Sequence, residues 1–123
     1  MRVFKTKWFA AFARGKRIGD HALCEAIERA ERGLIDADLG GKVIKQRVAR
    51  PGQGRSGGYR ILTAYERGIR AVFIYGFAKN ERDNIRDDEL TIVREVAADW
   101  LQFDDAALQQ ALDNERAEEV HCG

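Results

Sequence analysis

The chain has 123 residues, 45% of them hydrophobic, which is enough for one domain with a buried core and short for two. It has no run of about 18 apolar residues, which excludes a membrane-spanning helix, and its first residues lack the apolar stretch and cleavage site of a secretory signal. The formal net charge of +1 conceals a strong asymmetry, because residues 1–86 carry 19 Lys and Arg against 9 Asp and Glu, whereas residues 87–123 carry 2 against 11.

These features predict a cytoplasmic protein, in which the two cysteines, Cys24 and Cys122, are expected to be reduced thiols. His121 beside Cys122 does not predict a metal site, since zinc usually takes three or four protein ligands. The charge asymmetry is typical of a protein with one face that meets a polyanion. A basic sheet packed beside an acidic helix, with no ligand, is the alternative interpretation.

Two helices are predicted near the N-terminus, after a short strand at residues 3–5. Thr6 can cap a helix that runs through Arg14 and stops at Gly15. Asp20 can cap a second helix, whose apolar residues recur at i, i+3, i+4, i+7 and i+11 and therefore share one face. The apolar contacts of the two helices are Trp8, Phe9 and Phe12 in the first and Leu23, Ala26, Ile27, Ala30 and Leu34 in the second.

The middle of the chain changes to the periodicity of strands. Residues 43–50 alternate, and residues 59–65 and 70–77 are rich in aromatic and β-branched side chains. Residues 51–58, with the sequence PGQGRSGG, predict a loop. The connection at residues 66–69 is short, and it therefore predicts an antiparallel hairpin, because a parallel crossover needs about a dozen residues or more.

Two helices are predicted to follow. Three acids at residues 87–89 open the first, where the helix dipole favours negative charge, and Asp104 can cap the second. The order of helices, strands and helices predicts an α+β fold, with two N-terminal helices packed on a three- to four-stranded antiparallel sheet and C-terminal helix or helices after it. We expect a domain at residues 1–103 and an acidic extension at residues 104–123, with a possible short helix.

The most informative segment lies between Asp38 and Glu66, where no acidic residue occurs. Arginine presents a planar fork to phosphate oxygens and lysine a mobile charge, so a run of such cations indicates a phosphate-binding surface. A solvated basic face without a ligand is the alternative. The six cations of the segment are Lys42, Lys45, Arg47, Arg50, Arg55 and Arg60, and Lys79 and Arg82 follow the third strand. Candidates for stacking on RNA bases are Tyr59, Tyr65 and Tyr75.

Familiar catalytic sets are absent from the sequence. The two histidines, His21 and His121, lie far from the basic segment, and the glycine-rich loop lacks the Gly-Lys-Ser/Thr ending of a nucleotide-binding loop. A ribonuclease built from these residues would use the 2′-hydroxyl of RNA as nucleophile and would rely on positioning and charge neutralisation by Arg and Lys, with Lys or Tyr assisting proton transfer. No metal and no cofactor are expected.

Three segments together carry a family resemblance: residues 42–52 (KVIKQRVARPG), residues 54–60 (GRSGGYR) and residues 73–85 (FIYGFAKNERDNI). The chain resembles the RelE/HigB-type toxins of bacterial type II toxin–antitoxin modules over about Val3 to Leu101. The resemblance implies a compact RelE-like fold and a metal-independent endonuclease that cleaves mRNA on the ribosome, in contact with ribosomal RNA, and so inhibits translation.

The resemblance also implies roles for residues and partners. It places catalytic contacts on Lys45, Arg47, Arg60 and Lys79, and RNA-binding contacts on Lys42, Arg50, Arg55, Tyr59 and Arg82. Related toxins often carry a tyrosine or histidine after the sheet, whereas no tyrosine follows Tyr75 here, so the general base is unassigned. The implied partner is a cognate antitoxin, which in this family is often a helix-turn-helix protein. The toxin would contact operator DNA only through this antitoxin. No membrane partner is expected.

Two other functions remain open for this sequence. ParE-like relatives of the same fold inhibit a protein target, gyrase, without cleaving RNA, and a plain RNA-binding module would need no chemistry at all. Fold alone does not separate these functions, because function depends on the site. The dense cluster of cations on adjoining strands favours the nuclease.

Overall fold

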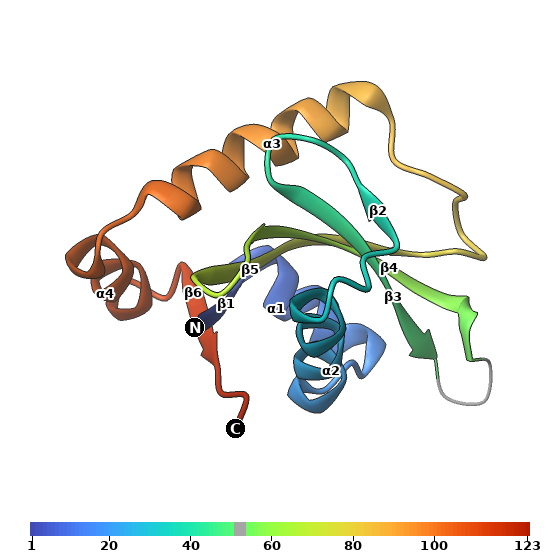
Figure 1. Cartoon of the computed structure of the whole chain (residues 1–123), viewed down its shortest axis with the longest axis horizontal. Coiled ribbons are helices and arrows are strands. Elements are labelled where there is room, and N and C mark those ends of the chain that lie inside the picture. Colours follow the sequence, from blue (N-terminus) through green and yellow to red (C-terminus); the bar gives the residue numbers. More distant parts are fainter. Residues whose placement is uncertain (51–53) are drawn as a thin grey trace.

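The computed structural model describes residues 1–50 and 54–123, and of residues 54–56 only the backbone. Helices lie on both faces of a central sheet, α1 and α2 on one and α3 on the other (Figure 1). In chain order the elements are β1 (Arg2–Thr6), α1 (Lys7–Lys16), α2 (Asp20–Glu31), β2 (Ala37–Asp38), β3 (Val43–Arg50), β4 (Gly54–Glu66), β5 (Arg70–Ala78), α3 (Asp87–Gln102), α4 (Asp105–Asp113) and β6 (Ala117–Val120).

The sheet has the strand order β2-β3-β4-β5-β1-β6. All neighbouring strands are antiparallel except β1 and β5, which are parallel. The predicted α+β class is confirmed, and so are the strand at residues 43–50 and the hairpin between β4 and β5. The sheet has more strands than the three or four that were expected. The short edge strands β2 and β6 lack a clear alternating pattern, and β1 pairs with β5 only after a long crossover.

Alternation along the strands divides the apolar residues between two cores. A strand sends successive side chains to opposite faces, so each central strand contributes to both cores. The core under α1 and α2 includes Phe9, Leu23, Ile27, Ile61 and Phe73. The core under α3 and α4 includes Phe4, Leu62, Val72, Val93 and Trp100.

The helix ends partly follow the sequence signals. Thr6 caps α1, since its hydroxyl accepts a hydrogen bond from the Phe9 backbone N–H at 3.2 Å. Gly15 does not stop this helix, which continues to Lys16 and ends at Arg17, a residue in the left-handed conformation with φ 58°. Asp20 is the first residue of α2 rather than its cap. Asp104 caps α4 as predicted, accepting from the Ala107 N–H at 2.8 Å.

The predicted loop at residues 51–58 is shorter in the structure. β4 begins at Gly54, so residues 54–58 are strand, and residues 51–53 lie outside the described part of the chain. The register shifts by a bulge between Val48 and Arg50. Gly58 lies against this bulge so closely that a Cβ atom would come within 2.1 Å of the Val48 carbonyl oxygen, which explains why a glycine stands there.

The C-terminal segment belongs to the same sheet. β6 pairs with β1, and Glu119 binds the Arg2 guanidinium through two hydrogen bonds of 3.0 Å. Cys122 forms a disulfide with Cys24 of α2, which corrects the expectation of two reduced thiols. The two cysteines are 98 residues apart in the sequence, and no sequence pattern indicated that they pair. Within the described residues, no helix has the length and apolar character needed to span a membrane.

Candidate nucleic-acid interface

Lys45, Arg47 and Arg60 lie on one face of the sheet, and we call these three residues the basic face. In the β3–β4 register Lys45 is opposite Leu62, which belongs to the core under α3, and Arg47 is opposite Arg60. Since residues two apart on a strand share a face, all three cations point to the side of the sheet that α3 covers. The predicted shared face of Lys45 and Arg47 is confirmed, and the register adds Arg60 to it.

The two arginines of the basic face repel each other. Like charges directly opposite on neighbouring strands are destabilising, because their Cβ atoms are only about 5 Å apart. Arg60 is 6% exposed, and burial, followed by the charge of Arg47, lowers the pKa of its guanidinium, while Asp36 acts in the opposite direction. Arg47 is exposed and Lys45 is half-buried. An anion bound at this face would offset the repulsion.

The backbone of Arg47 is held from both sides. Its N–H donates to the Asp36 carboxylate at 2.7 Å, and its carbonyl oxygen accepts a hydrogen bond from the Arg29 guanidinium at 2.5 Å. The neighbouring Gln46 side chain is fully buried, where it donates to the Ala26 and Leu34 carbonyl oxygens and accepts from the Asp36 N–H. These contacts tie β3 to α2 at the position where the basic face begins.

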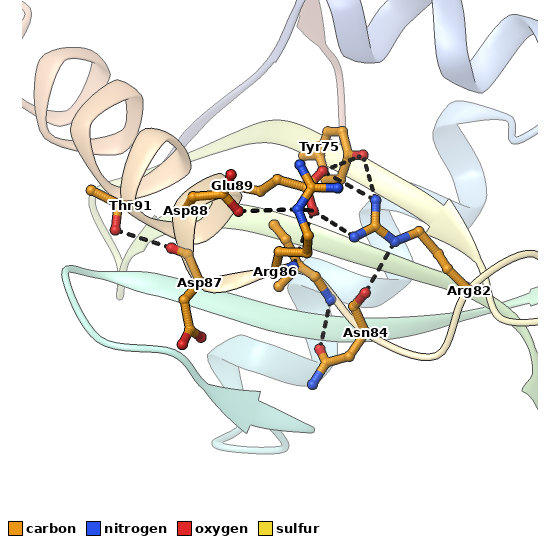
Figure 2. Close-up of polar contacts among 9 residues, drawn as sticks. Tyr75, Arg82, Asn84, Arg86, Asp87, Asp88, Glu89 and Thr91 are labelled. Atoms are coloured by element: carbon orange, nitrogen blue, oxygen red, sulfur yellow. Dashed lines mark hydrogen bonds and ion pairs between the residues drawn. The ribbon is translucent and has the colours of Figure 1, made fainter.

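Arg82 is held by an acid that α3 supplies. Its guanidinium forms two hydrogen bonds to Glu89, at 2.5 and 3.1 Å, and a third of 3.3 Å to the Tyr75 hydroxyl. Figure 2 shows Arg82 reaching from the segment after β5 to both residues, with Arg86 beside them. The hydrogen bonds from Arg82 are the largest cause that lowers the pKa of Glu89 to about 2, and the Arg86 backbone N–H adds another.

Glu89 therefore balances the charge of Arg82, whose guanidinium also lies 5.5 Å from the centre of the Phe77 ring. Phe77 is in turn opposite Arg60 in the β4–β5 register. Arg82 is thus next to the basic face, but it is engaged in a network within the protein. This network fixes the start of α3, since the Glu89 carboxylate also accepts a hydrogen bond of 3.0 Å from the backbone N–H of Arg86, the N-cap residue of that helix.

Two of the predicted RNA-binding residues lie away from the basic face. Lys42 is at the other end of β3, where its ammonium group is 3.3 Å from the Glu66 carboxylate. Tyr59 is 4% exposed and packs in the core under α1, with its hydroxyl donating to the Lys16 carbonyl oxygen at 3.5 Å. Arg50 lies over Tyr59, with its guanidinium 6.0 Å from the centre of the Tyr59 ring.

The remaining candidates have different surroundings. Lys79 is exposed at the exit of β5, and its backbone N–H donates to the Gly58 carbonyl oxygen at 3.1 Å. The side chain of Arg55 lies outside the described part of the structure. Tyr65 is buried in the core under α2 and donates a hydrogen bond to Glu31, and burial and this carboxylate raise the pKa of its hydroxyl.

The sequence did not reveal two residues near the basic face. Glu89 was predicted only as an acid favoured at the start of a helix, and the sequence has no capping-box signal there because Arg86, not Ser or Thr, is the N-cap residue. Trp8 was predicted as an apolar contact of the first helix, yet it stacks on Tyr75 and is 49% exposed. Phe12, four residues further along α1, also stacks on Trp8, but no sequence signal indicated the contact with Tyr75 of β5. Across residues 1–50 and 54–123, no three His, Cys, Asp or Glu residues are grouped as a metal site requires.

Comparison with known proteins gives one match. The family model described as "RelE toxin of RelE / RelB toxin-antitoxin system" matches residues 1–120. The match includes all three residues of the basic face, the network around Arg82 and the strand β6. No curated protein and no solved structure matches the chain.

Proposed function

The chain belongs to the RelE toxin family, and we propose that it is an endonuclease that cleaves mRNA on the ribosome and thereby inhibits translation. The observation that carries this proposal is the pair of directly opposed arginines, Arg47 and Arg60, with Lys45 on the same face. The two charges repel each other, and a further anion bound at this face would reduce that repulsion. A phosphate of the RNA backbone is an anion that arginine binds well.

The proposed reaction uses the substrate's own nucleophile. The 2′-hydroxyl of one nucleotide attacks the adjacent phosphorus, an O2′–P bond forms, and the bond from phosphorus to the 5′-oxygen of the next nucleotide breaks. Arg47 and Arg60 stabilise the negative charge that develops on the phosphate oxygens. Lys45 transfers a proton to the departing 5′-oxygen, and the 2′-hydroxyl passes its own proton to solvent water as it attacks. The products are a 2′,3′-cyclic phosphate and a free 5′-hydroxyl.

One other cation has a supporting role in this proposal. Lys79, at the exit of β5, contacts the phosphate backbone beside the basic face. Arg50 lies over the Tyr59 ring on the α1 side and is therefore not assigned to this contact, and the side chain of Arg55 lies outside the described part of the structure. Three other predicted RNA-binding residues are not part of the proposed contact set. Lys42 is ion-paired at the far end of β3, Tyr59 is buried under α1, and Arg82 is bound to Glu89.

The proposed partner follows from the family description, which pairs the RelE toxin with a RelB antitoxin. We propose that a cognate antitoxin binds and neutralises this chain, and that operator DNA is reached only through the antitoxin. Growth arrest on induction of the chain alone, relieved by co-expression of the adjacent gene, supports this pairing.

The test is a translation reaction with the purified protein, read by primer extension on the mRNA. We expect cuts at the ribosomal decoding site and a loss of about 100- to 1,000-fold in cleavage rate for Arg47→Ala, which removes one charge-stabilising donor. Arg47 is exposed, so this variant should fold. Arg67→Ala is the matched control, since Arg67 is exposed in the turn between β4 and β5.

Other outcomes would replace the proposal. Intact mRNA together with trapped gyrase–DNA complexes would indicate a ParE-like inhibitor of a protein target. Binding of RNA without any cleavage would indicate a plain RNA-binding module.

A further inference from the structure

Trp8 stands out among the aromatic residues near the basic face because half of its side chain is solvent-exposed. It is 49% exposed, whereas Tyr59, Tyr65 and Phe77 are buried. The ring stacks on Tyr75, with 4.7 Å between ring centroids and 28° between ring planes, and on Phe12, with 5.4 Å and 12°. β1 pairs with β5 only as far as Phe73, so Trp8, at the start of α1, lies beside the part of β5 that β1 leaves uncovered.

An open hollow lies against Trp8. It has a volume of about 330 Å³, near the lower end of the range for small-ligand pockets, about 300–1,000 Å³. Ile74 and Val96 contribute apolar walls, and two cations, Lys7 and Arg116, line it as well. These cations are neighbours, because the Lys7 backbone N–H donates to the Arg116 carbonyl oxygen at 2.9 Å. The hollow thus combines an aromatic wall with positive charge.

A continuous series of contacts connects the basic face with Trp8. Arg60 is opposite Phe77, and the Arg82 guanidinium lies 5.5 Å from the Phe77 ring centre. Arg82 also donates a hydrogen bond of 3.3 Å to the Tyr75 hydroxyl, and the Tyr75 ring stacks on Trp8. A single strand of RNA that lies on the basic face can therefore continue past Tyr75 to the hollow.

We propose that Trp8 stacks on an unpaired nucleobase of the RNA strand whose backbone the basic face binds, and that Lys7 and Arg116 hold the phosphate next to this base. The inference rests on the proposed function, because it needs single-stranded RNA at the basic face. Base–aromatic stacking is the usual way in which proteins hold single-stranded RNA. It tolerates any base, since every base presents a π-face. An isolated exposed apolar residue needs no explanation, but here the aromatic ring, the hollow and the two cations occur together.

The chain offers a direct reporter for this contact, because it has two tryptophans and the second, Trp100, is only 5% exposed. In a Trp100→Phe variant, fluorescence comes from Trp8. A short single-stranded 2′-O-methyl RNA, which lacks the nucleophile and stays uncut, is titrated into this variant. We expect saturable quenching of Trp8 emission. Trp100 lines the same hollow and is no independent reporter, so a strand without bases provides the control.

A second titration uses an abasic strand of the same length, which carries the phosphates without the bases. It should bind the basic face without quenching Trp8. Trp8→Leu keeps an apolar side chain of moderate size, and it should weaken binding of the base-containing strand about 5- to 100-fold with no comparable effect on the abasic strand. A urea midpoint close to that of the wild type shows that the Leu variant is folded.

Three results would overturn the inference while leaving the proposed function intact: binding with unchanged Trp8 emission, equal quenching by the abasic strand, or wild-type affinity in Trp8→Leu. Quenching by a peptide of the antitoxin but not by RNA would assign the hollow to a protein partner instead. Failure of the strand to bind the wild-type protein, with Arg47→Ala unchanged in every assay, would contradict both the inference and the proposed function.

Discussion

Arg47 and Arg60 lie directly opposite each other on β3 and β4, and Arg60 is almost fully buried. Because like charges in this position repel, the surrounding structure must hold the pair in place. It does so through the backbone of Arg47, which binds Asp36 on one side and the buried Arg29 on the other. Asp36 counteracts the effect of burial and of Arg47 on the pKa of Arg60, and a phosphate bound at the basic face would add further negative charge.

The first prediction concerns the salt dependence of RNA binding. Each phosphate contact to a single strand contributes about 0.7 to the slope of log affinity against log salt concentration. Arg47→Ala should therefore weaken binding of an uncleavable RNA strand and reduce the slope by about 0.7. Lys42→Asn removes a charge that already pairs with Glu66, and asparagine tolerates the left-handed conformation of this position (φ 63°). An equal reduction of the slope in both variants would argue against the basic face.

The second prediction concerns the ion pair of Glu89 with Arg82. The pKa of Glu89 in the folded protein is about 2, against an ordinary value of 4.5. A carboxylate with a lowered pKa contributes stability above its unfolded pKa and loses it as the pH falls toward its folded pKa. Glu89→Gln should therefore be less stable than the wild type at pH 7. The difference should shrink between pH 4.5 and about 2.

Urea unfolding at a series of pH values measures this difference. Glutamine can still accept the hydrogen bond from the Arg86 N–H, so the cap of α3 is largely retained and the variant isolates the charge. A stability difference that stays constant through the acid range would show that Glu89 acts through packing or capping alone.

The third prediction concerns the disulfide between Cys24 and Cys122. A cross-link that spans 98 residues restricts the unfolded chain strongly. The chain-entropy model gives about 4–5 kcal/mol for a loop of this size. Reduction with a dithiol should lower the urea midpoint of the wild type, and a Cys24→Ser, Cys122→Ser variant should unfold at this lower midpoint with or without the dithiol. If the urea midpoint of the wild-type protein is the same with and without the dithiol, this prediction is wrong.

The fourth prediction concerns the bulge between Val48 and Arg50, which follows Arg47 in β3. A Cβ atom at Gly58 would lie 2.1 Å from the Val48 carbonyl oxygen and 2.9 Å from the Arg50 nitrogen, so the backbone of β3 or β4 must move in Gly58→Ala. Overpacking of this kind costs about 1–3 kcal/mol. We also expect loss of cleavage, because Arg60 is two residues further along β4. Gly15→Ala is the control, since Gly15 lies inside α1 with open space around it and alanine favours helices. It should be neutral or stabilising.

Much of the fold follows from local patterns in the sequence. The alternation at residues 43–50, the turn at residues 66–69 and the cap at Asp104 each specify an element through contacts within a few residues. Lys45 and Arg47 were predicted to share a face for the same reason, because the period of a strand decides which residues share a face. The position of Arg60 opposite Arg47 depends on the register of β3 and β4. The function of that face came from the family resemblance rather than from any pattern.

Tertiary structure alone decided which cations are available to a ligand. Arg82 and Lys42 look like Arg47 in the sequence, yet Glu89 and Glu66 pair with them, and these partners come from other strands and helices. The disulfide and the stacking of Trp8 on Tyr75 likewise join segments that are distant along the chain. Local periodicity determines the direction of a side chain, but its partners depend on how the strands and helices pack, which no short stretch of sequence encodes.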